Sequence, residues 1–153
     1  MTVEELVHRL AGRGETLATA ESLTGGLLAA TIVSVPGVSA VYRGGLVTYA
    51  TDLKASLAGV PADLLAERGA VDPDVAVALA VGARKACGAH WGLSTTGVAG
   101  PDSPEGKPVG LVYVGCAGPD GREVVELRLA GDRAAIRTAA VTAALDLLAR
   151  MGE

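Results

Sequence analysis

The segment TLATAESLTGGLLAATIVS, residues 16–34, decides the fold class of this chain. Its first five residues are apolar or β-branched and predict a short buried strand over residues 16–20. A polar, glycine-rich break follows, and the next apolar stretch predicts a helix over residues 25–34 with Thr24 as its N-cap. Pro36 ends that helix. A strand that leads through a glycine turn into a helix is typical of an α/β protein.

The same alternation of helix and strand extends over the whole chain. Asp72-Pro73 is a typical helix start, and Pro119-Asp120-Gly121 is a typical hairpin turn. The remaining sequence predicts helices over residues 3–12, 51–59, 61–69, 73–87 and from Gly131 onward, strands over residues 44–50, 91–97, 109–117 and 122–130, and an exposed loop over 101–108. Together these elements predict a single layered α/β/α domain over residues 1–153, with a mixed β-sheet and helices on both faces.

The composition fits one compact domain with a core of small side chains. Of the 153 residues, 50% are hydrophobic and 20% are charged, so we expect a sizeable core. Aromatic residues make up only 3%, and the chain has no phenylalanine. The core must therefore consist mainly of Ala, Val and Leu, and we expect helices and strands to pack closely.

Charge, cysteine and histidine content argue against several classes of protein. A net charge of −4 argues against a protein that binds nucleic acid by neutralising its phosphates. No apolar stretch is long enough for a membrane span and no targeting segment is visible, so we expect a cytoplasmic protein. Cys87 and Cys116 are interpreted as buried reduced thiols. His8 and His90 have no ligand-like spacing, which argues against a metal site.

Common nucleotide-binding and hydrolase motifs do not occur in the sequence. No Gly-x-Gly-x-x-Gly follows a predicted strand, and there is no Gly-x-Ser-x-Gly or Ser-x-x-Lys. Gly100 and Gly106-Lys107 resemble a P-loop, but the glycine spacing is one residue too long. Pro108 stands where Ser or Thr would bind magnesium.

Residues 20–26, Ala-Glu-Ser-Leu-Thr-Gly-Gly, form the first candidate site. Free backbone amides at a helix start stabilise an oxyanion or bind phosphate, and glycines let a ligand approach the backbone. Ser22 would be placed there to attack a carbonyl group. The plainer interpretation is that Ser22 and Thr24 are only helix caps, which are common at such positions.

Two further candidates stand at the ends of predicted strands. In the segment Thr48–Lys54, Lys54 falls in the first turn of a predicted helix. The helix dipole makes this position mildly unfavourable for a cation, so a function that needs a neutral lysine as base could use it. The alternative is a solvated lysine beside a packed Tyr49. Ser94–Pro101 places three hydroxyl groups before glycines, which is typical of a ligand-binding edge, although a plain glycine turn explains it equally well.

A fourth candidate is the arginine pair at the start of the last helix. Arg133 and Arg137 are four residues apart and repel each other slightly unless an anion lies between them, so they could clamp a phosphate. A solvated helix face is the alternative. His90, Trp91 and Glu105 show no convergent pattern and are interpreted as structural or surface residues.

These four segments, in this order, resemble the CinA C-terminal domain family, which includes the nicotinamide-nucleotide amidases. The similarity covers nearly the whole chain, and several motifs in a fixed order are far more specific than any one alone. Many relatives carry Cys where this chain has Leu23, and we expect little consequence. The matching stretches are Ala20–Gly26, Gly45–Tyr49 with Lys54, Gly69–Val71, Thr96–Pro101, Lys107–Gly110 and Gly131–Arg133.

The resemblance implies an amidohydrolase that works without a metal or cofactor. Members of the family hydrolyse the carboxamide of nicotinamide mononucleotide to nicotinic acid mononucleotide and ammonia, in pyridine nucleotide recycling, through a Ser–Lys arrangement. By this resemblance Ser22 is the nucleophile, Lys54 is the general base, and Tyr49 assists proton transfer or orients Lys54. The implied binding residues are the amides of Thr24, Gly25 and Gly26 for the oxyanion, Thr96, Gly97, Ala99 and Gly100 for the nucleotide pocket, and Arg133 with Arg137 for the phosphate.

Two other function classes stay open at this point. A non-catalytic nucleotide-binding or regulatory module would bind the ligand without releasing ammonia. A small kinase or phosphatase is weakened by the broken P-loop and by the lack of an evident cluster of metal-binding carboxylates. The expected partner is a small nucleotide, not nucleic acid or a membrane. The resemblance and the Ala-rich helices together favour a homo-oligomer.

Overall fold

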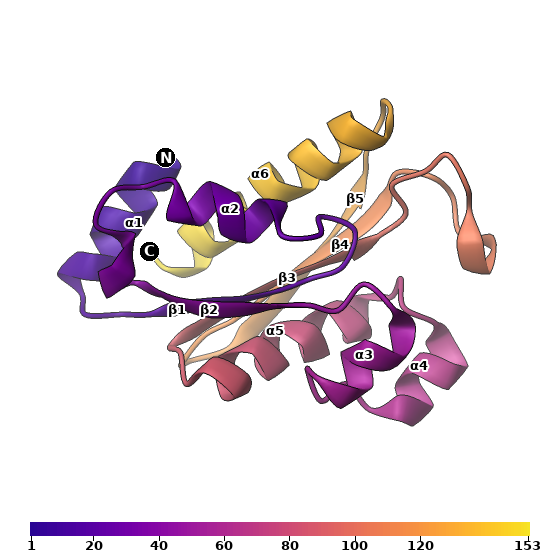
Figure 1. Ribbon diagram of the computed structural model, residues 1–153, viewed down its shortest axis with the longest axis horizontal. Helices are drawn as coiled ribbons and strands as arrows, with labels where there is room; N and C mark the ends of the chain where they lie inside the picture. Colours follow the sequence, from indigo (N-terminus) through magenta and orange to yellow (C-terminus); the bar gives the residue numbers. More distant parts are fainter.

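A five-stranded mixed β-sheet forms the centre of the computed structural model, which describes residues 1–153 (Figure 1). The strand order is β2-β1-β3-β4-β5. β1 runs parallel to β2 and β3, whereas β4 runs antiparallel to β3 and β5. The predicted mixed sheet and the predicted hairpin are confirmed. The strands are β1 (Leu17–Glu21), β2 (Tyr42–Val47), β3 (Trp91–Gly97), β4 (Leu111–Ala117) and β5 (Arg122–Arg128).

Helices cover both faces of this sheet, as the predicted α/β/α layering requires. Helices α1, α2 and α6 lie on one face and α3, α4 and α5 on the other (Figure 1). Two short 3₁₀ turns, η1 (Val38–Ala40) and η2 (Pro104–Gly106), complete the chain. The helices are α1 (Val3–Gly12), α2 (Leu27–Val33), α3 (Thr51–Ser56), α4 (Ala62–Arg68), α5 (Pro73–Cys87) and α6 (Arg133–Met151).

The core consists of small apolar side chains, and the layers approach closely. Its largest cluster of buried residues lies between the sheet and α1, α2 and α6, and a smaller cluster lies under α5. Gly115 on β4 faces the backbone of α5 directly, because a Cβ there would lie only 2.6 Å from the Ala76 carbonyl oxygen. The expected close packing is therefore confirmed.

The predicted start of the helix after β1, with its predicted N-cap, is wrong. The helix predicted over 25–34 begins only at Leu27, and its N-cap is Gly26, not Thr24. Gly25 and Gly26 have φ angles of 56° and 104°, a left-handed conformation that favours glycine and cannot continue a right-handed helix. The chain therefore makes a separate loop over residues 22–26 before α2.

The strand and helix around Tyr49 also differ from their predicted limits. β2 covers Tyr42–Val47 instead of 44–50, because its partner β1 ends at Glu21, opposite Val47. α3 begins at Thr51 but ends at Ser56, before the predicted limit at residue 59, and its N-cap is Ala50, whose side chain makes no hydrogen bond. The residues 48–50 thus form a short connection across the end of the sheet.

Both cysteines are free thiols, as expected, but only Cys116 is buried, while Cys87 is half-buried. Desolvation raises the pKa of Cys116 to about 12, so this group stays a thiol at neutral pH. None of the helices has the length and apolar character needed to cross a membrane.

Candidate active site

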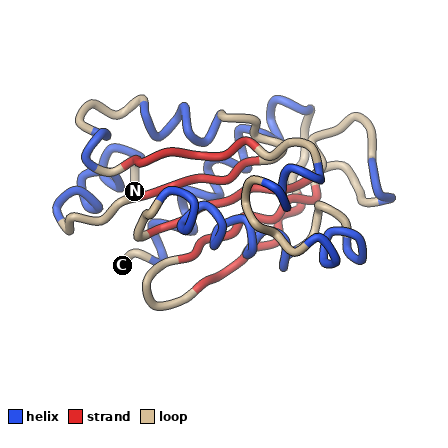
Figure 2. Tube along the Cα trace, turned by 60° about the horizontal axis from the view of Figure 1, so that its bottom comes forward, coloured by secondary structure: helices blue, strands red, loops and turns tan.

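The parallel strands β1, β2 and β3 end at one edge of the sheet, and the loops that follow them meet there (Figure 2). Ligands of α/β proteins bind at this kind of edge, outside the carboxyl ends of the strands. A cavity of about 330 Å³ lies at this edge and is lined by residues from the loops after β1, β2 and β3. It is within the size range of small-molecule sites.

Ser22 and Lys54 are in contact at this edge. Ser22 follows β1 directly, and Lys54 lies in α3, after β2. The Lys54 Nζ lies 3.0 Å from the Ser22 Oγ and donates to the carbonyl oxygens of Thr48 (2.6 Å) and Tyr49 (3.3 Å). A neutral amine has two N–H bonds and one lone pair, so it can donate to both carbonyls while its lone pair accepts the serine proton.

Burial makes the neutral form of this lysine accessible. The Lys54 side chain is 0% exposed, and no carboxylate lies within ion-pairing distance of it. Desolvation lowers the pKa of Lys54 from 10.5 to about 8, although the more distant Glu105 opposes this shift. The neutral form that a general base requires is therefore far more populated at neutral pH than in an ordinary lysine, although the charged form still predominates there.

The backbone amides at the start of α2 were predicted to bind an oxyanion, but they already bind the carboxylate of Glu21. Glu21 is 0% exposed, and its side chain accepts hydrogen bonds from the Thr24 hydroxyl and from the amides of Gly26 (3.2 Å), Leu28 (2.8 Å) and Ala29 (3.1 Å). The Gly25 amide donates to the Ser22 carbonyl. The prediction that the amides of Gly25 and Gly26 are free is therefore wrong.

Two other amides of the same loop have no partner within the protein. The amides of Leu23 and Thr24 donate neither to the backbone nor to a side chain. Thr24 therefore keeps its predicted free amide, and Leu23 adds a second. Both follow Ser22 in the chain, and buried amides of this kind are strong donors to a developing oxyanion.

The two arginines of α6 make different contacts. Arg133 lines the cavity, and its guanidinium donates to the Gly100 carbonyl oxygen (2.8 Å) and the Tyr49 hydroxyl (3.0 Å). Arg137 does not line the cavity and donates instead to the carbonyl oxygens of Leu23 (3.0 Å) and Thr24 (2.8 Å). The predicted phosphate clamp of two arginines is therefore reduced to Arg133.

The end of β3 supplies the opposite wall of the cavity. Its three hydroxyl groups point to different partners: Ser94 donates to the Ala76 carbonyl, Thr95 pairs with Thr24, and Thr96 donates to the Ala70 carbonyl. These hydroxyls hold neighbouring elements together, so the polar groups that this wall leaves free for a ligand are in the backbone that follows. The amides of Ala99 and Gly100 make no hydrogen bond within the protein.

Most of the predicted site residues line one cavity. Those that do are Ser22, Tyr49, Lys54, Thr96, Gly97, Ala99, Gly100 and Arg133, whereas Thr24, Gly25, Gly26 and Arg137 are not among its lining residues. Tyr49 is 58% exposed, and its phenol contacts Arg133, while only its backbone carbonyl contacts Lys54.

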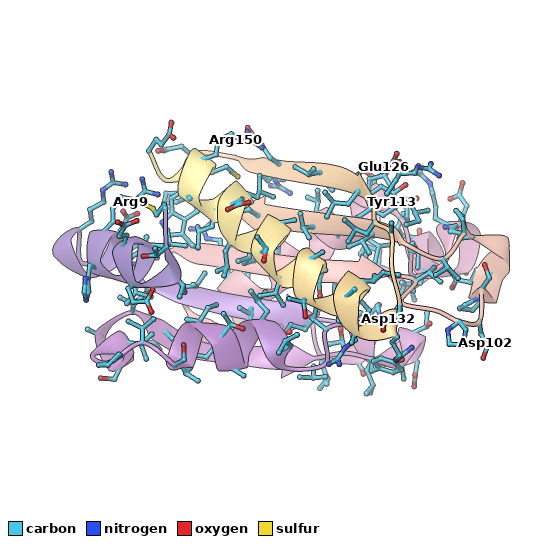
Figure 3. All side chains as sticks on the ribbon, turned by 90° about the horizontal axis from the view of Figure 1, so that it is seen from above. Arg9, Asp102, Tyr113, Glu126, Asp132 and Arg150 are labelled. Atoms are coloured by element: carbon cyan, nitrogen blue, oxygen red, sulfur yellow. The ribbon has the colours of Figure 1, made fainter.

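Sequence reasoning missed several residues on the side of the cavity formed by loop 101–108. These are Ala70, Val71, Asp102 and Glu105, together with Thr51. Glu105, which was interpreted as a structural or surface residue, has a structural contact: its carboxylate accepts from the Ala70 amide (3.1 Å) and so joins the loop to the connection between α4 and α5. Figure 3 shows Asp102 of this loop at the same end of the molecule as Asp132, at the start of α6, and far from Arg9. The matched stretches Gly69–Val71 and Lys107–Gly110 were the signals for this side, and Lys107 donates to the Val71 carbonyl oxygen.

No group of three or more His, Cys, Asp and Glu side chains in the chain is arranged to hold a metal ion.

The sequence and the fold are similar to those of CinA proteins. The family model of the CinA C-terminal domain matches residues 1–151. CinA-like proteins of Frankia casuarinae and Geobacter sulfurreducens are 56% and 51% identical over 93% and 97% of this chain, which corresponds to 33% and 37% of their own length. The chain thus spans about a third of the length of these relatives.

Solved structures agree with this relationship over nearly their whole length. The competence/damage inducible protein CihA from Agrobacterium tumefaciens superposes with a TM-score of 0.91 at 36% identity, covering 99% of this chain and 96% of that protein. A CinA superfamily protein from Escherichia coli gives a TM-score of 0.94 at 29% identity, covering 97% and 87%. The chain belongs to the CinA C-terminal domain family.

Proposed function

We propose that this chain is a nicotinamide-nucleotide amidase, which converts nicotinamide mononucleotide to nicotinic acid mononucleotide and ammonia. The observation that carries the proposal is the contact between the Ser22 Oγ and the Nζ of the fully buried Lys54, at 3.0 Å, inside a ligand-sized cavity. Ser–Lys pairs are a known variant of the catalytic triad. The proposal also rests on the family resemblance in the sequence.

The first step forms a covalent acyl-enzyme. The Ser22 Oγ attacks the carboxamide carbon, while its proton passes to the neutral Lys54 Nζ. The carbonyl oxygen becomes an oxyanion, which the free amides of Leu23 and Thr24 stabilise. A single such donor is typically worth about 3 kcal/mol in the transition state, and an amide needs this support because it is a poor electrophile.

The second step breaks the C–N bond and then releases the product. Lys54 returns its proton to the leaving nitrogen, so that ammonia departs and the acyl group stays on Ser22. A water molecule then attacks the acyl carbon, with Lys54 as base. The Ser22 oxygen leaves as the hydroxyl, and the product is a carboxylic acid. Lys54 thus acts as base and acid in turn.

The outer part of the cavity suits the phosphorylated end of the substrate. Arg133 supplies the cation, and the free amides of Ala99 and Gly100 supply neutral donors, which together resemble other phosphate sites. Tyr49 orients Arg133 through its phenol. Thr96 and Gly97 also line the cavity.

Ammonia release from nicotinamide mononucleotide by the purified protein, in the presence of EDTA, tests the proposal. Wild type should release ammonia, whereas Ser22→Ala and Lys54→Met should lose activity by about 10³-fold or more. Nicotinamide mononucleotide that binds without ammonia release would favour a non-catalytic binding module instead. Release that stops on addition of EDTA would contradict the metal-free mechanism.

A further inference from the structure

The loop that carries the nucleophile, residues 22–26, is held in place by two charged side chains from different elements. Glu21, at the end of β1, accepts from the amides on the α2 side of the loop. Arg137, on α6, donates from its Nε and Nη2 to the consecutive carbonyl oxygens of Leu23 and Thr24. Among the loop amides from Leu23 to Gly26, only those of Leu23 and Thr24 donate to no other group of the protein.

The peptide geometry links these carbonyls to the free amides. In a trans peptide the C=O and the following N–H belong to one rigid plane and point in opposite directions. The Leu23 carbonyl shares its plane with the Thr24 amide, and the Ser22 carbonyl shares its plane with the Leu23 amide. Arg137 binds the first of these carbonyls at 3.0 Å, and the Gly25 amide binds the second at 3.0 Å. Each free amide therefore has a fixed direction.

Arg137 also supports the second of these planes indirectly. Its Nη2 binds the Thr24 carbonyl, which shares a peptide plane with the Gly25 amide. That amide in turn holds the Ser22 carbonyl. The half-buried Arg137 guanidinium thus orients the Thr24 amide directly. It orients the Leu23 amide indirectly, through the hydrogen bond from the Gly25 amide to the Ser22 carbonyl.

We propose that Arg137 is a positioning residue that aims the Thr24 and Leu23 amides at the substrate oxyanion. The inference rests on the proposed amidase function and deepens it, because it assigns Arg137 to the transition state instead of to phosphate binding. Arg133, one turn earlier on the same helix, contacts the cavity and serves as the matched control.

Steady-state kinetics of Arg137→Ala and Arg133→Ala separate the two roles. We expect Arg137→Ala to lower kcat by about 10- to 100-fold, which is the loss of part of an oxyanion donor, with KM within about twofold of wild type. Arg133→Ala should instead raise KM. Guanidinium ion at millimolar concentration should restore part of the kcat of Arg137→Ala, whereas Arg137→Lys should recover little, because one Nζ cannot match the planar fork.

A purely structural role for Arg137 would give a different pattern. It would lower the melting temperature, while kcat per folded molecule, measured by titration of reactive Ser22, would stay unchanged. A rise in KM that equals that of Arg133→Ala would overturn the inference in favour of phosphate binding.

Amide NMR spectra of ¹⁵N-labelled protein test the orientation without relying on turnover. Arg137→Ala should shift or broaden the Leu23 and Thr24 amide signals while most other signals stay in place. Unchanged Leu23 and Thr24 signals would overturn the inference. If wild type released no ammonia, the proposed function would fail, and these spectra would still decide whether Arg137 orients the two amides.

Discussion

Lys54 has an environment that differs from that of an ordinary lysine. It is fully buried, it has no carboxylate partner, and its three hydrogen-bonding contacts end on two carbonyl oxygens and the Ser22 hydroxyl. A charged ammonium in such a place is costly, because burial removes its hydration. The surroundings therefore lower the pKa of Lys54 and make its neutral form more accessible than in a lysine exposed to water.

The lowered pKa of Lys54 predicts the pH dependence of the amidase. Since desolvation lowers this pKa to about 8, the neutral base becomes more abundant as the pH rises. We expect kcat/KM for ammonia release to increase about tenfold per pH unit below pH 8 and to level off above it. A flat profile between pH 6 and pH 9 would contradict the role of Lys54 as base.

The same burial predicts that Lys54 destabilises the folded protein. The pKa of Lys54 is lower in the folded state than its ordinary value of 10.5. The penalty is therefore complete below pH 8 and disappears as the pH rises to 10.5. We expect Lys54→Met to raise the free energy of unfolding by about 2 kcal/mol at pH 7, measured by urea denaturation. Lys85→Met, at an exposed position on α5, should leave it nearly unchanged.

Some site residues could be predicted from the sequence because they stand in local motifs at element ends. Ser22, Lys54 and Arg133 belong to this group. The roles of Glu21 and Arg137 could not, because they depend on tertiary contacts. Arg137 binds the Leu23 carbonyl, which lies 114 positions earlier in the chain. No pattern of spacing in a single sequence reports such a pair.

At the scale of the elements, helix α5 and the sheet are held together by contacts that leave no room for a side chain. Gly115 on β4 lies against the Ala76 carbonyl of α5, and Gly92 on β3 lies against the Ala80 carbonyl one turn later. Close helix–sheet packing of this kind needs glycine, because any Cβ would displace backbone atoms.

Gly115→Ala should therefore destabilise the fold. Its Cβ would lie 2.6 Å from the Ala76 carbonyl oxygen and 2.7 Å from the Ser94 hydroxyl. Overpacking of this kind typically costs about 1–3 kcal/mol, and thermal unfolding followed by circular dichroism measures it. Gly12→Ala on α1 is the control, because no atom lies within 4 Å of its Cβ position. If both variants had equal melting temperatures, the packing argument would be wrong.

The order of the elements could be predicted, but several of their ends could not. Periodicity and glycine or proline signals correctly indicated every α-helix and strand, but neither of the two 3₁₀ turns. The start of α2 was misplaced because the Glu21 carboxylate caps it from the end of β1 and the two glycines adopt left-handed angles. β2 ends earlier than predicted because its pairing partner ends there. Both limits depend on a contact with a neighbouring strand, which the local sequence does not report.

At the scale of the whole molecule, we expect the protein to assemble into a homo-oligomer. Several large apolar side chains are about half exposed, among them Val33 (49%) and Leu57 (49%), and such surfaces are often covered in assemblies. Size-exclusion chromatography with light scattering should give a mass of two or more times 15.2 kDa. A single 15.2 kDa species at micromolar concentration would contradict this expectation.

The pairing of β1 with β2 has a consequence for how the chain can change during evolution. Glu21 lies opposite Val47, so the next residues, Ser22 and Thr48, leave the sheet side by side, and Lys54 reaches both. Gaining or losing one residue between Tyr42 and Lys54 would separate the two halves of the dyad. The hairpin turn at 118–121 has no such constraint. Descendants of this chain can therefore vary in length at that turn, while the segment from Tyr42 to Lys54 keeps a constant number of residues.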